Sequence, residues 1–311
     1  MPSVQSVHYD KLLTNISVAY KNDQYIADQI LKEVPVDKQS DKYPVYGEEI
    51  FVAQDDRRAP GTEANEIDWT YSDDTYFCEG HALRHRIPDE AIQNADEAFN
   101  LEEEATVLTT EGILLNKEID AANLLLNAAN YDPDLVVSTG GANQPLKWDN
   151  DNADPIDTVL RAKETMHQKI ALNPNTLILS YPVYNRIRRH PALIALVKVQ
   201  DLSIVPDALL KEFFEVDNLI VGKAVASNPR NNIKSYIWGK SAILAYVPEK
   251  PGRKVPAFGY TFAWKKDGNQ SIFVRKWYDE GPRCTFVESE RWYDHKIIAR
   301  RAGVLFPDVI N

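Results

Sequence analysis

The end of the chain alternates short apolar and aromatic runs with polar breaks. The runs AFGYTFAW, IFVRKW and TFVESERWYDHKII lie within residues 257–298, separated by KKDGNQ and YDEGPR, and a last apolar run surrounds Ala302-Gly303. Short runs rich in aromatic and β-branched residues, bounded by Gly, Asp and Asn, are typical of strands. The pattern predicts an antiparallel sheet built from residues 257–311.

Two helical patterns precede it in the first half of the chain. Residues 22–34 predict a short helix that Pro35 ends. Residues 94–131 contain no proline and predict a long amphipathic helix, bent at Gly112. Its apolar positions recur at three- and four-residue steps: Ala98, Leu101, Ala105, Leu108, Leu115, Ile119, Ala122, Leu126 and Ala129.

The middle of the chain, residues 132–250, alternates the two patterns. Asp154 is a good N-cap, with Pro155 at the first helical position. Further helices are predicted at 181–190 and 206–214, and strands at 176–180, 218–225, 235–239 and 242–247. This alternation favours a mixed α/β unit.

Residues 41–92 predict a long two-stranded excursion with a polar tip. Ile67, Trp69 and Tyr71 alternate with polar residues, as in a half-buried strand. A long hairpin is marginal alone in water, so we expect it to lie on its own domain or on a neighbouring subunit. The candidate docking residues are two arginines and two glutamates at the tip and two aromatic anchors: Arg57, Arg58, Glu63, Glu66, Trp69 and Tyr71.

Charge is distributed unevenly over the 311 residues, whose formal net charge is −11. Residues 1–131 hold 26 acidic and 10 basic residues, 132–249 hold 13 of each, and 250–311 hold 7 acidic and 12 basic. The imbalance either serves solubility alone or lets the acidic front of one subunit meet the basic end of another. It argues against a sequence-reading nucleic-acid binder, and no apolar run is long enough to span a bilayer.

No motif points to catalysis, a cofactor or a metal. The chain lacks the GxxxxGK[ST] and GxGxxG phosphate loops and the GxSxG nucleophile turn. Cys78, His81 and His85 do not converge, because a strand places Cys78 on the face opposite the two histidines. We therefore expect no catalytic, cofactor-binding or metal residues, and free thiols at Cys78 and Cys284.

The order of these elements resembles the tailed-phage major capsid proteins of the Hong Kong 97-type fold. Short phrases are also similar to members of that family: 217–224 (DNLIVGKA), 237–240 (IWGK), 259–262 (GYTF) and 302–306 (AGVLF). The resemblance covers nearly the whole chain and implies an α+β fold. Its parts would be an N-terminal arm (1–40), an extended hairpin loop (41–92), the spine helix of a peripheral domain (93–131), an axial α/β domain (132–250) and returning peripheral-domain strands (251–311).

The resemblance implies a structural protein without enzymatic activity. Such a protein self-assembles into hexamers and pentamers of an icosahedral head that encloses double-stranded DNA, in a virion assembled in the host cytoplasm. Some relatives crosslink a hairpin lysine, but no lysine lies between Lys42 and Lys117, so a non-covalent shell is expected. The short arm implies a separate scaffolding protein, alongside a portal and, as in some heads, decoration proteins.

Two other functions fit the composition. The first is the shell of an encapsulin-like nanocompartment, because related shells enclose enzymes instead of DNA. The second is a soluble α/β enzyme whose site is built from residues distant in sequence. A co-purifying cargo enzyme would favour the first, and a discrete small oligomer the second.

Overall fold

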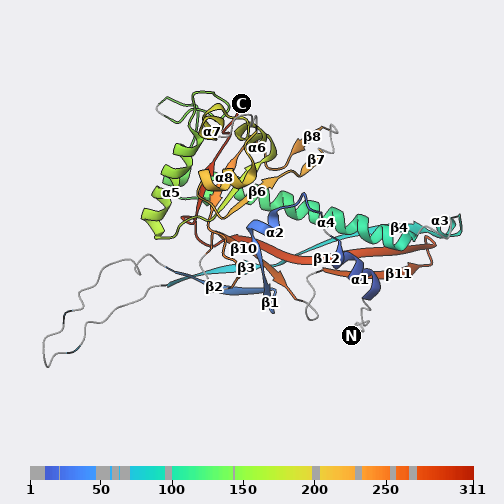
Figure 1. Cartoon of the computed structure of the whole chain (residues 1–311). Helices are drawn as coiled ribbons and strands as arrows, with labels where there is room; N and C mark the ends of the chain where they lie inside the picture. Colours follow the sequence, from blue (N-terminus) through green and yellow to red (C-terminus); the bar gives the residue numbers. More distant parts are fainter. Residues whose placement is uncertain are drawn as a thin grey trace.

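The computed structural model describes residues 11–20, 22–46, 57, 63, 71–94, 100–142, 144–197, 204–227, 233–252, 257–265 and 272–311. Two bodies make up the molecule: a long sheet backed by a long helix, and a smaller α/β body over one end of that sheet (Figure 1). A two-stranded ribbon lies at the same end of the long sheet (Figure 1). We call it the β2–β3 ribbon, made of β2 (Ser40–Tyr46) and β3 (Tyr71–Phe77).

The long sheet is organised around β12 (Cys284–Ile297). This strand pairs antiparallel with β4 (Glu79–Pro88), β11 (Ile272–Asp279) and β10 (Gly259–Trp264). β10 also pairs in parallel with β1 (Lys32–Val36). The strands predicted within residues 257–298 are therefore confirmed, and the chain's front supplies two further strands to the same sheet. The expectation that the sheet continues to residue 311 was wrong, because the last strand, β13 (Gly303–Phe306), joins the sheet of the α/β body.

The long helix α4 (Leu101–Leu125) lies along β12 and β4. Asn100 caps its start by accepting a hydrogen bond from the backbone N–H of Glu103 (3.4 Å). Gly112 allows a close approach to the sheet, since a Cβ there would lie 2.6 Å from Leu83 Cδ1. A second helix, α1 (Lys11–Ala19), packs beside α4 and against β11, and α3 (Asp89–Asn94) follows β4.

Two expectations about the front of the chain were wrong. The helix predicted over 22–34 is a single turn, α2 (Ala27–Ile30), followed by β1, which contains Pro35. An edge position tolerates proline because one side of the strand donates no ladder hydrogen bond, and pairing with β10 outweighs the local helical pattern. Among the described residues of 41–92, β2 pairs with β3, whereas β4 joins β12 instead of extending the hairpin.

The α/β body has a four-stranded sheet in the order β13, β9, β5, β6. Its strands are β5 (Thr176–Ser180), β6 (Asn218–Gly222), β9 (Ala242–Ala245) and β13 (Gly303–Phe306). Its helices are α5 (Pro155–Ile170), α6 (Tyr181–Ile187), α7 (Pro191–Leu196) and α8 (Asp207–Phe213), with short 3-10 turns at Ala128–Asn130 and Pro133–Leu135. A small hairpin, β7 (Val225–Ser227) and β8 (Lys234–Tyr236), projects from it.

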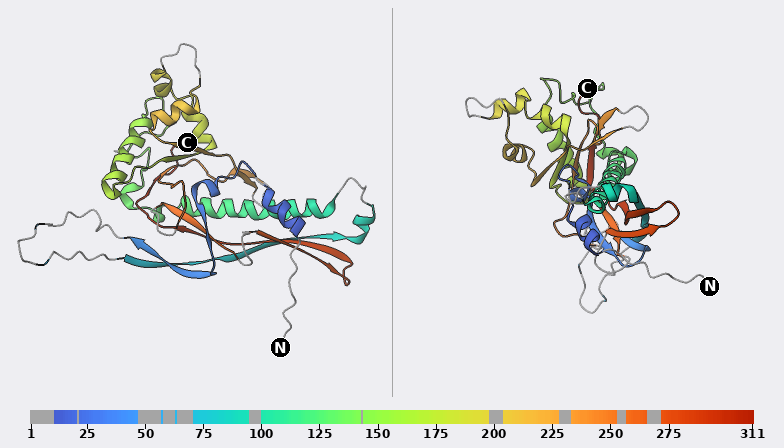
Figure 2. Two further views of the ribbon diagram at one scale, coloured as in Figure 1. Left: turned by 60° about the horizontal axis from the view of Figure 1, so that its bottom comes forward. Right: turned by 90° about the vertical axis from the view of Figure 1, so that its right-hand side faces the viewer.

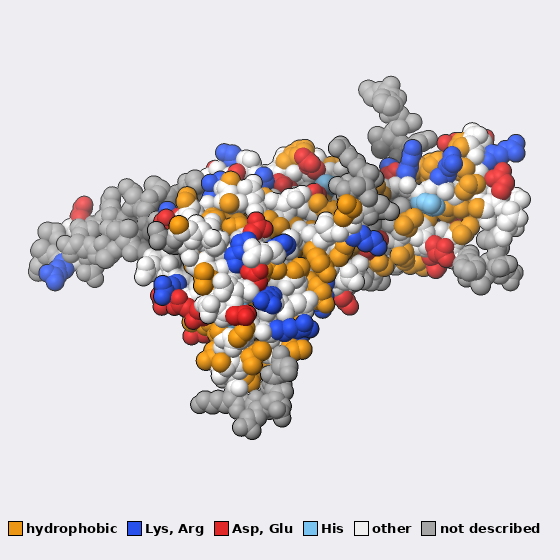
Figure 3. All heavy atoms as spheres, turned by 90° about the horizontal axis from the view of Figure 1, so that it is seen from above, with side chains coloured by type: hydrophobic (Ala, Val, Ile, Leu, Met, Phe, Trp, Pro, Cys, Tyr) orange, Lys and Arg blue, Asp and Glu red, His pale blue; other side chains and the backbone are white. Residues whose placement is uncertain are grey.

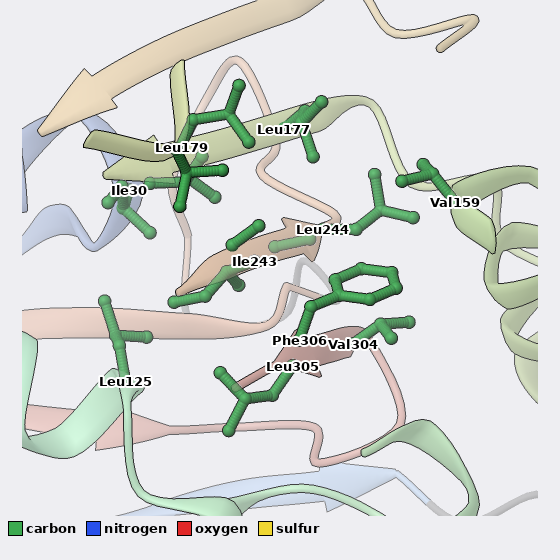
Figure 4. Packing of buried hydrophobic residues seen from close by; sticks show 14 of the residues in the cluster. Ile30, Leu125, Val159, Leu177, Leu179, Ile243, Leu244, Val304, Leu305 and Phe306 are labelled. Carbon is green, nitrogen blue, oxygen red and sulfur yellow. The ribbon is translucent and has the colours of Figure 1, made fainter. Parts of the chain in front are cut away.

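One apolar core joins the two bodies. Leu177, Ile243 and Phe306 of the four-stranded sheet pack with Val159 of α5 (Figure 4). Ile30 of α2 and Leu125 of α4 belong to the same cluster. The arm and the end of the long helix are thereby tied to the α/β body.

Candidate assembly surfaces

The β2–β3 ribbon is fixed at its base by aromatic packing. The rings of Tyr43 and Tyr76 lie 5.3 and 4.6 Å from the ring of Phe262 in β10. The Tyr43 hydroxyl donates to Asp74 Oδ2 (2.7 Å), and the backbone N–H of Phe77 donates to Asp294 Oδ2 (2.9 Å). These contacts hold the root of the ribbon on the sheet.

Hydrogen bonding and burial shift the ionisation of groups at this root. The hydrogen bond from Tyr43 lowers the pKa of Asp74, although partial burial opposes the shift. Burial raises the pKa of Tyr43 and that of Asp294. The Asp74–Tyr43 pair therefore remains a carboxylate accepting from a neutral phenol across the neutral pH range, which favours a stable root.

The structure places only part of the predicted docking set. Arg57 and Glu63 are described, and both are exposed. Tyr71 is the first residue of β3, in register with Tyr46 of β2. Arg58, Glu66 and Trp69 lie outside the described residues. Docking by this set therefore stays a prediction.

The opposite end of the long sheet carries a stack of cationic and aromatic side chains. The Arg84 guanidinium lies 5.1 Å from the ring centre of Phe286, which stacks on Trp277 at 5.4 Å. Arg275 lies over Trp277 and also pairs with Glu288. Arg84 and Arg86 are exposed, and alternation along β4 places them on one face. Figure 3 shows basic, histidine, acidic and apolar side chains exposed at this end of the molecule.

A buried carboxylate joins the arm, the long helix and the α/β body. Glu118 of α4 accepts hydrogen bonds from the backbone N–H groups of Ile26 (3.0 Å) and Ala27 (2.8 Å). It also accepts from Trp238 Nε1 (2.8 Å) of the α/β body. Burial raises the pKa of Glu118. Because the arm and the α/β body both donate to one side chain of α4, the relative positions of these three segments are set together.

The adjacent residue carries a second buried charge. Lys117 forms ion pairs with Asp28 and with Glu33 (3.4 Å), and Arg291 of β12 also pairs with Glu33. Burial lowers the pKa of Lys117. These four side chains, which we call the arm clasp, hold β1 and α2 against α4 and β12.

The amphipathic pattern located the long helix but not its buried face. Leu108, expected in the apolar stripe, is 59% exposed. The buried side instead includes hydroxyls and charges: Thr106, Thr109, Thr110, Lys117 and Glu118. These buried hydroxyls have hydrogen-bond partners, because Thr109 hydrogen-bonds to Ser289 (2.8 Å) and Thr110 to Ser17 (2.7 Å). The sequence signal that could have indicated this polar buried side was the adjacent pair Lys117-Glu118 in the middle of the predicted helix.

The cysteine and histidine side chains singled out in the sequence make packing contacts. No group of three or more His, Cys, Asp or Glu within those residues could hold a metal ion. Cys78 is buried with its thiol toward the Phe262 carbonyl oxygen (3.4 Å), and His81 stacks on Tyr293 at 4.2 Å. Among the described helices, none is both long and apolar enough to cross a membrane.

Two proteins of similar sequence are both major capsid proteins of phages. The chain is 30% identical over 310 residues to a major capsid protein of Burkholderia phage BcepMu, covering 96% of each chain. It is 29% identical over 262 residues to a major capsid protein of Pseudomonas phage JBD67, covering 82% of each. No protein-family model matches the chain.

Solved structures share the arrangement. A phage-related protein from Bordetella bronchiseptica RB50 is 25% identical with a TM-score of 0.79 and covers 98% of each chain. The capsid of cyanophage P-SCSP1u has a TM-score of 0.59 at 10% identity, with coverage of 99% of this chain and 90% of that one. An encapsulin of Synechococcus elongatus PCC 7942 has a TM-score of 0.56 at 12% identity, with coverage of 100% and 94%. The last two likenesses concern the fold alone.

Proposed function

Because the chain belongs to the family of phage major capsid proteins, we propose that it assembles through the two opposite ends of its long sheet. It is a structural protein and not an enzyme. Its function is to build the hexamers and pentamers of an icosahedral head around double-stranded DNA. The single observation that carries this function is the 30% identity over 96% of both chains.

Charge complementarity supports contact between opposite ends. The segment that joins the two strands of the β2–β3 ribbon, residues 47–70, contains seven acidic and two basic residues. The far end of the sheet exposes Arg84 and Arg86 beside the half-buried rings of Phe286 and Trp277. Contacts between two different surfaces run head to tail, and they close into rings when the rotation between subunits permits.

The docking residues proposed for the tip are those expected from the sequence. Arg57 and Arg58 would pair with acids of the neighbour, and Glu63 and Glu66 with its arginines. Trp69 and Tyr71 would supply apolar contact. Each exposed pair contributes little, about 0–1 kcal/mol, so stability of the shell would come from many simultaneous contacts.

Several finer features complete the proposal. The shell would be non-covalent, since no lysine lies between Lys42 and Lys117. A separate scaffolding protein, a portal and decoration proteins would take part, with assembly in the host cytoplasm. The partition into arm, hairpin loop, peripheral and axial domains also remains part of this proposal.

Electron microscopy of the purified protein, alone and with neighbouring gene products co-expressed, tests the proposal. We expect closed shells or rings, with DNA rather than a cargo enzyme co-purifying. An Arg57→Glu, Arg58→Glu variant should stay folded but fail to form shells, whereas Lys250→Glu with Arg300→Glu changes charge equally elsewhere. Unimpaired assembly of the tip variant would refute docking by the tip arginines without affecting the family assignment.

A further inference from the structure

Helices α1 and α4 border a hollow of about 510 Å³ on the surface of the long-sheet body. α1 lies across the first half of α4 (Figure 2). The apolar wall of the hollow consists of Ile16, Val107 and Leu108. We call this site the α1–α4 hollow.

The apolar wall continues onto exposed surface. Leu108 is 59% exposed, so its side chain stands in water beside the hollow. Leu12 is 65% exposed and precedes Ile16 by one helical turn, which places both on the same side of α1. Large apolar side chains exposed next to a hollow mark a surface suited to a partner.

The opposite side of α1 is already occupied. Leu13, Thr14 and Ser17 are buried. Thr14 Oγ1 accepts from the backbone N–H of Val274 (3.1 Å), and Ser17 bonds to Thr110 (2.7 Å). α1 is therefore held in place by the chain itself through Thr14 and Ser17.

The charge around the hollow has one sign. Three glutamates border it, Glu103, Glu104 and Glu111, and among the described residues no lysine, arginine or histidine lines it. Glu111 is held in place because it accepts from Asn22 Nδ2 (3.0 Å) and from the Tyr25 hydroxyl. An occupant must therefore combine apolar side chains with positive charge.

We propose that the α1–α4 hollow binds an amphipathic helix of a different protein, with apolar residues at three- and four-residue spacing flanked by Lys or Arg. Two helices with an apolar groove between them accept a third helix through such spacing. The acidic front of a second copy is a poor occupant, because residues 1–131 hold 26 acidic and 10 basic residues. The role of the hollow as a docking point for an assembly helper rests on the proposed function. Binding of a helix to the hollow does not, because it is measured on the dissociated subunit.

The test uses a labelled peptide of about 18 residues, or about five helical turns, with Leu at the helix-facing positions and Lys elsewhere. A second peptide carries Glu in place of Lys. Fluorescence anisotropy measures binding of each peptide to the full chain at physiological salt. We expect saturable binding of one Lys peptide per chain and none of the Glu peptide.

Two variants matched in charge decide where the peptide binds. Leu108→Lys with Glu104→Lys alters the hollow, and Leu196→Lys with Glu164→Lys alters another surface that also exposes a leucine. The first should weaken binding by at least about tenfold and the second by less than about twofold. Equal loss in both variants, or no saturable binding to the parent, would overturn the proposal. So would a change in self-association of the first variant in sedimentation, which would assign the hollow to a second copy.

Discussion

Replacing Lys117 by Met tests the arm clasp most directly. Methionine replaces the apolar stem of the side chain, one heavy atom shorter, but removes its charge. Lys117 is almost completely buried and pairs with Asp28 and Glu33. The substitution therefore removes the only contribution of α4 to the clasp and leaves two carboxylates with less compensation.

The magnitude follows from what those carboxylates retain. Breaking a buried ion pair costs about 3–5 kcal/mol when the remaining charge is uncompensated. Here the Asp28 side chain is 53% exposed and can rehydrate, and Glu33 keeps Arg291. We expect the free energy of unfolding to fall by about 2 kcal/mol. The control Lys38→Met breaks a surface pair with Asp41 and should cost less than about 0.5 kcal/mol.

The pH dependence gives a second readout. Burial alone would raise the pKa of Glu33, but Arg291 and Lys117 lower it to about 2. A carboxyl with a lowered folded pKa stabilises the fold above its unfolded pKa of about 4.3, and this stability is lost as the pH falls through the folded value. Without Lys117 the pKa of Glu33 rises, so the variant has less of this stability to lose.

Urea unfolding of dissociated subunits, followed by tryptophan fluorescence, measures both effects. The gap in unfolding free energy between parent and variant should be present at neutral pH. It should narrow as the pH falls from about 5 to about 3. A variant as stable as the parent at neutral pH, or a gap that widens on acidification, would refute the reasoning.

Two further predictions concern buried groups. Gly222→Ala should cost about 1–3 kcal/mol of unfolding free energy, because the new Cβ would lie 2.4 Å from Trp238 Cδ1 and displace the donor to Glu118. The control Gly281→Ala, in a turn, should cost less than about 0.5 kcal/mol. Equal shifts of the thermal unfolding midpoint in the two variants would contradict this prediction. Burial raises the pKa of Cys78 to about 12, so a thiol reagent at neutral pH should label it only on unfolding, and rapid native labelling would contradict its burial.

Local signals in the sequence predicted elements that are held by contacts between residues near one another in the chain. They also predicted helices whose first turn carries a capping residue or a proline. Asp154 caps α5 by accepting from the backbone N–H of Asp157 (3.0 Å), and Pro155 occupies the first turn. β5 and the strands after residue 257 were also predicted, since apolar and aromatic runs indicate strands in any sheet that buries them. Of the candidate assembly surfaces, the sequence indicated the tip of the ribbon but neither the Arg84–Phe286 stack nor the hollow beside α1.

The sequence alone determined where the long helix and the strands after residue 257 lie and where the capped helix α5 begins, because capping, proline geometry and apolar periodicity act over a few residues. Only the tertiary structure decided that 32–36 is a strand, that Lys117 and Glu118 are buried and that Leu108 faces water. It also placed β13 in the sheet of the α/β body, beside β9, rather than with the strands that precede it. Each of these outcomes depends on a partner far away in the chain, and the free energy of that contact exceeds the local preference of the residues.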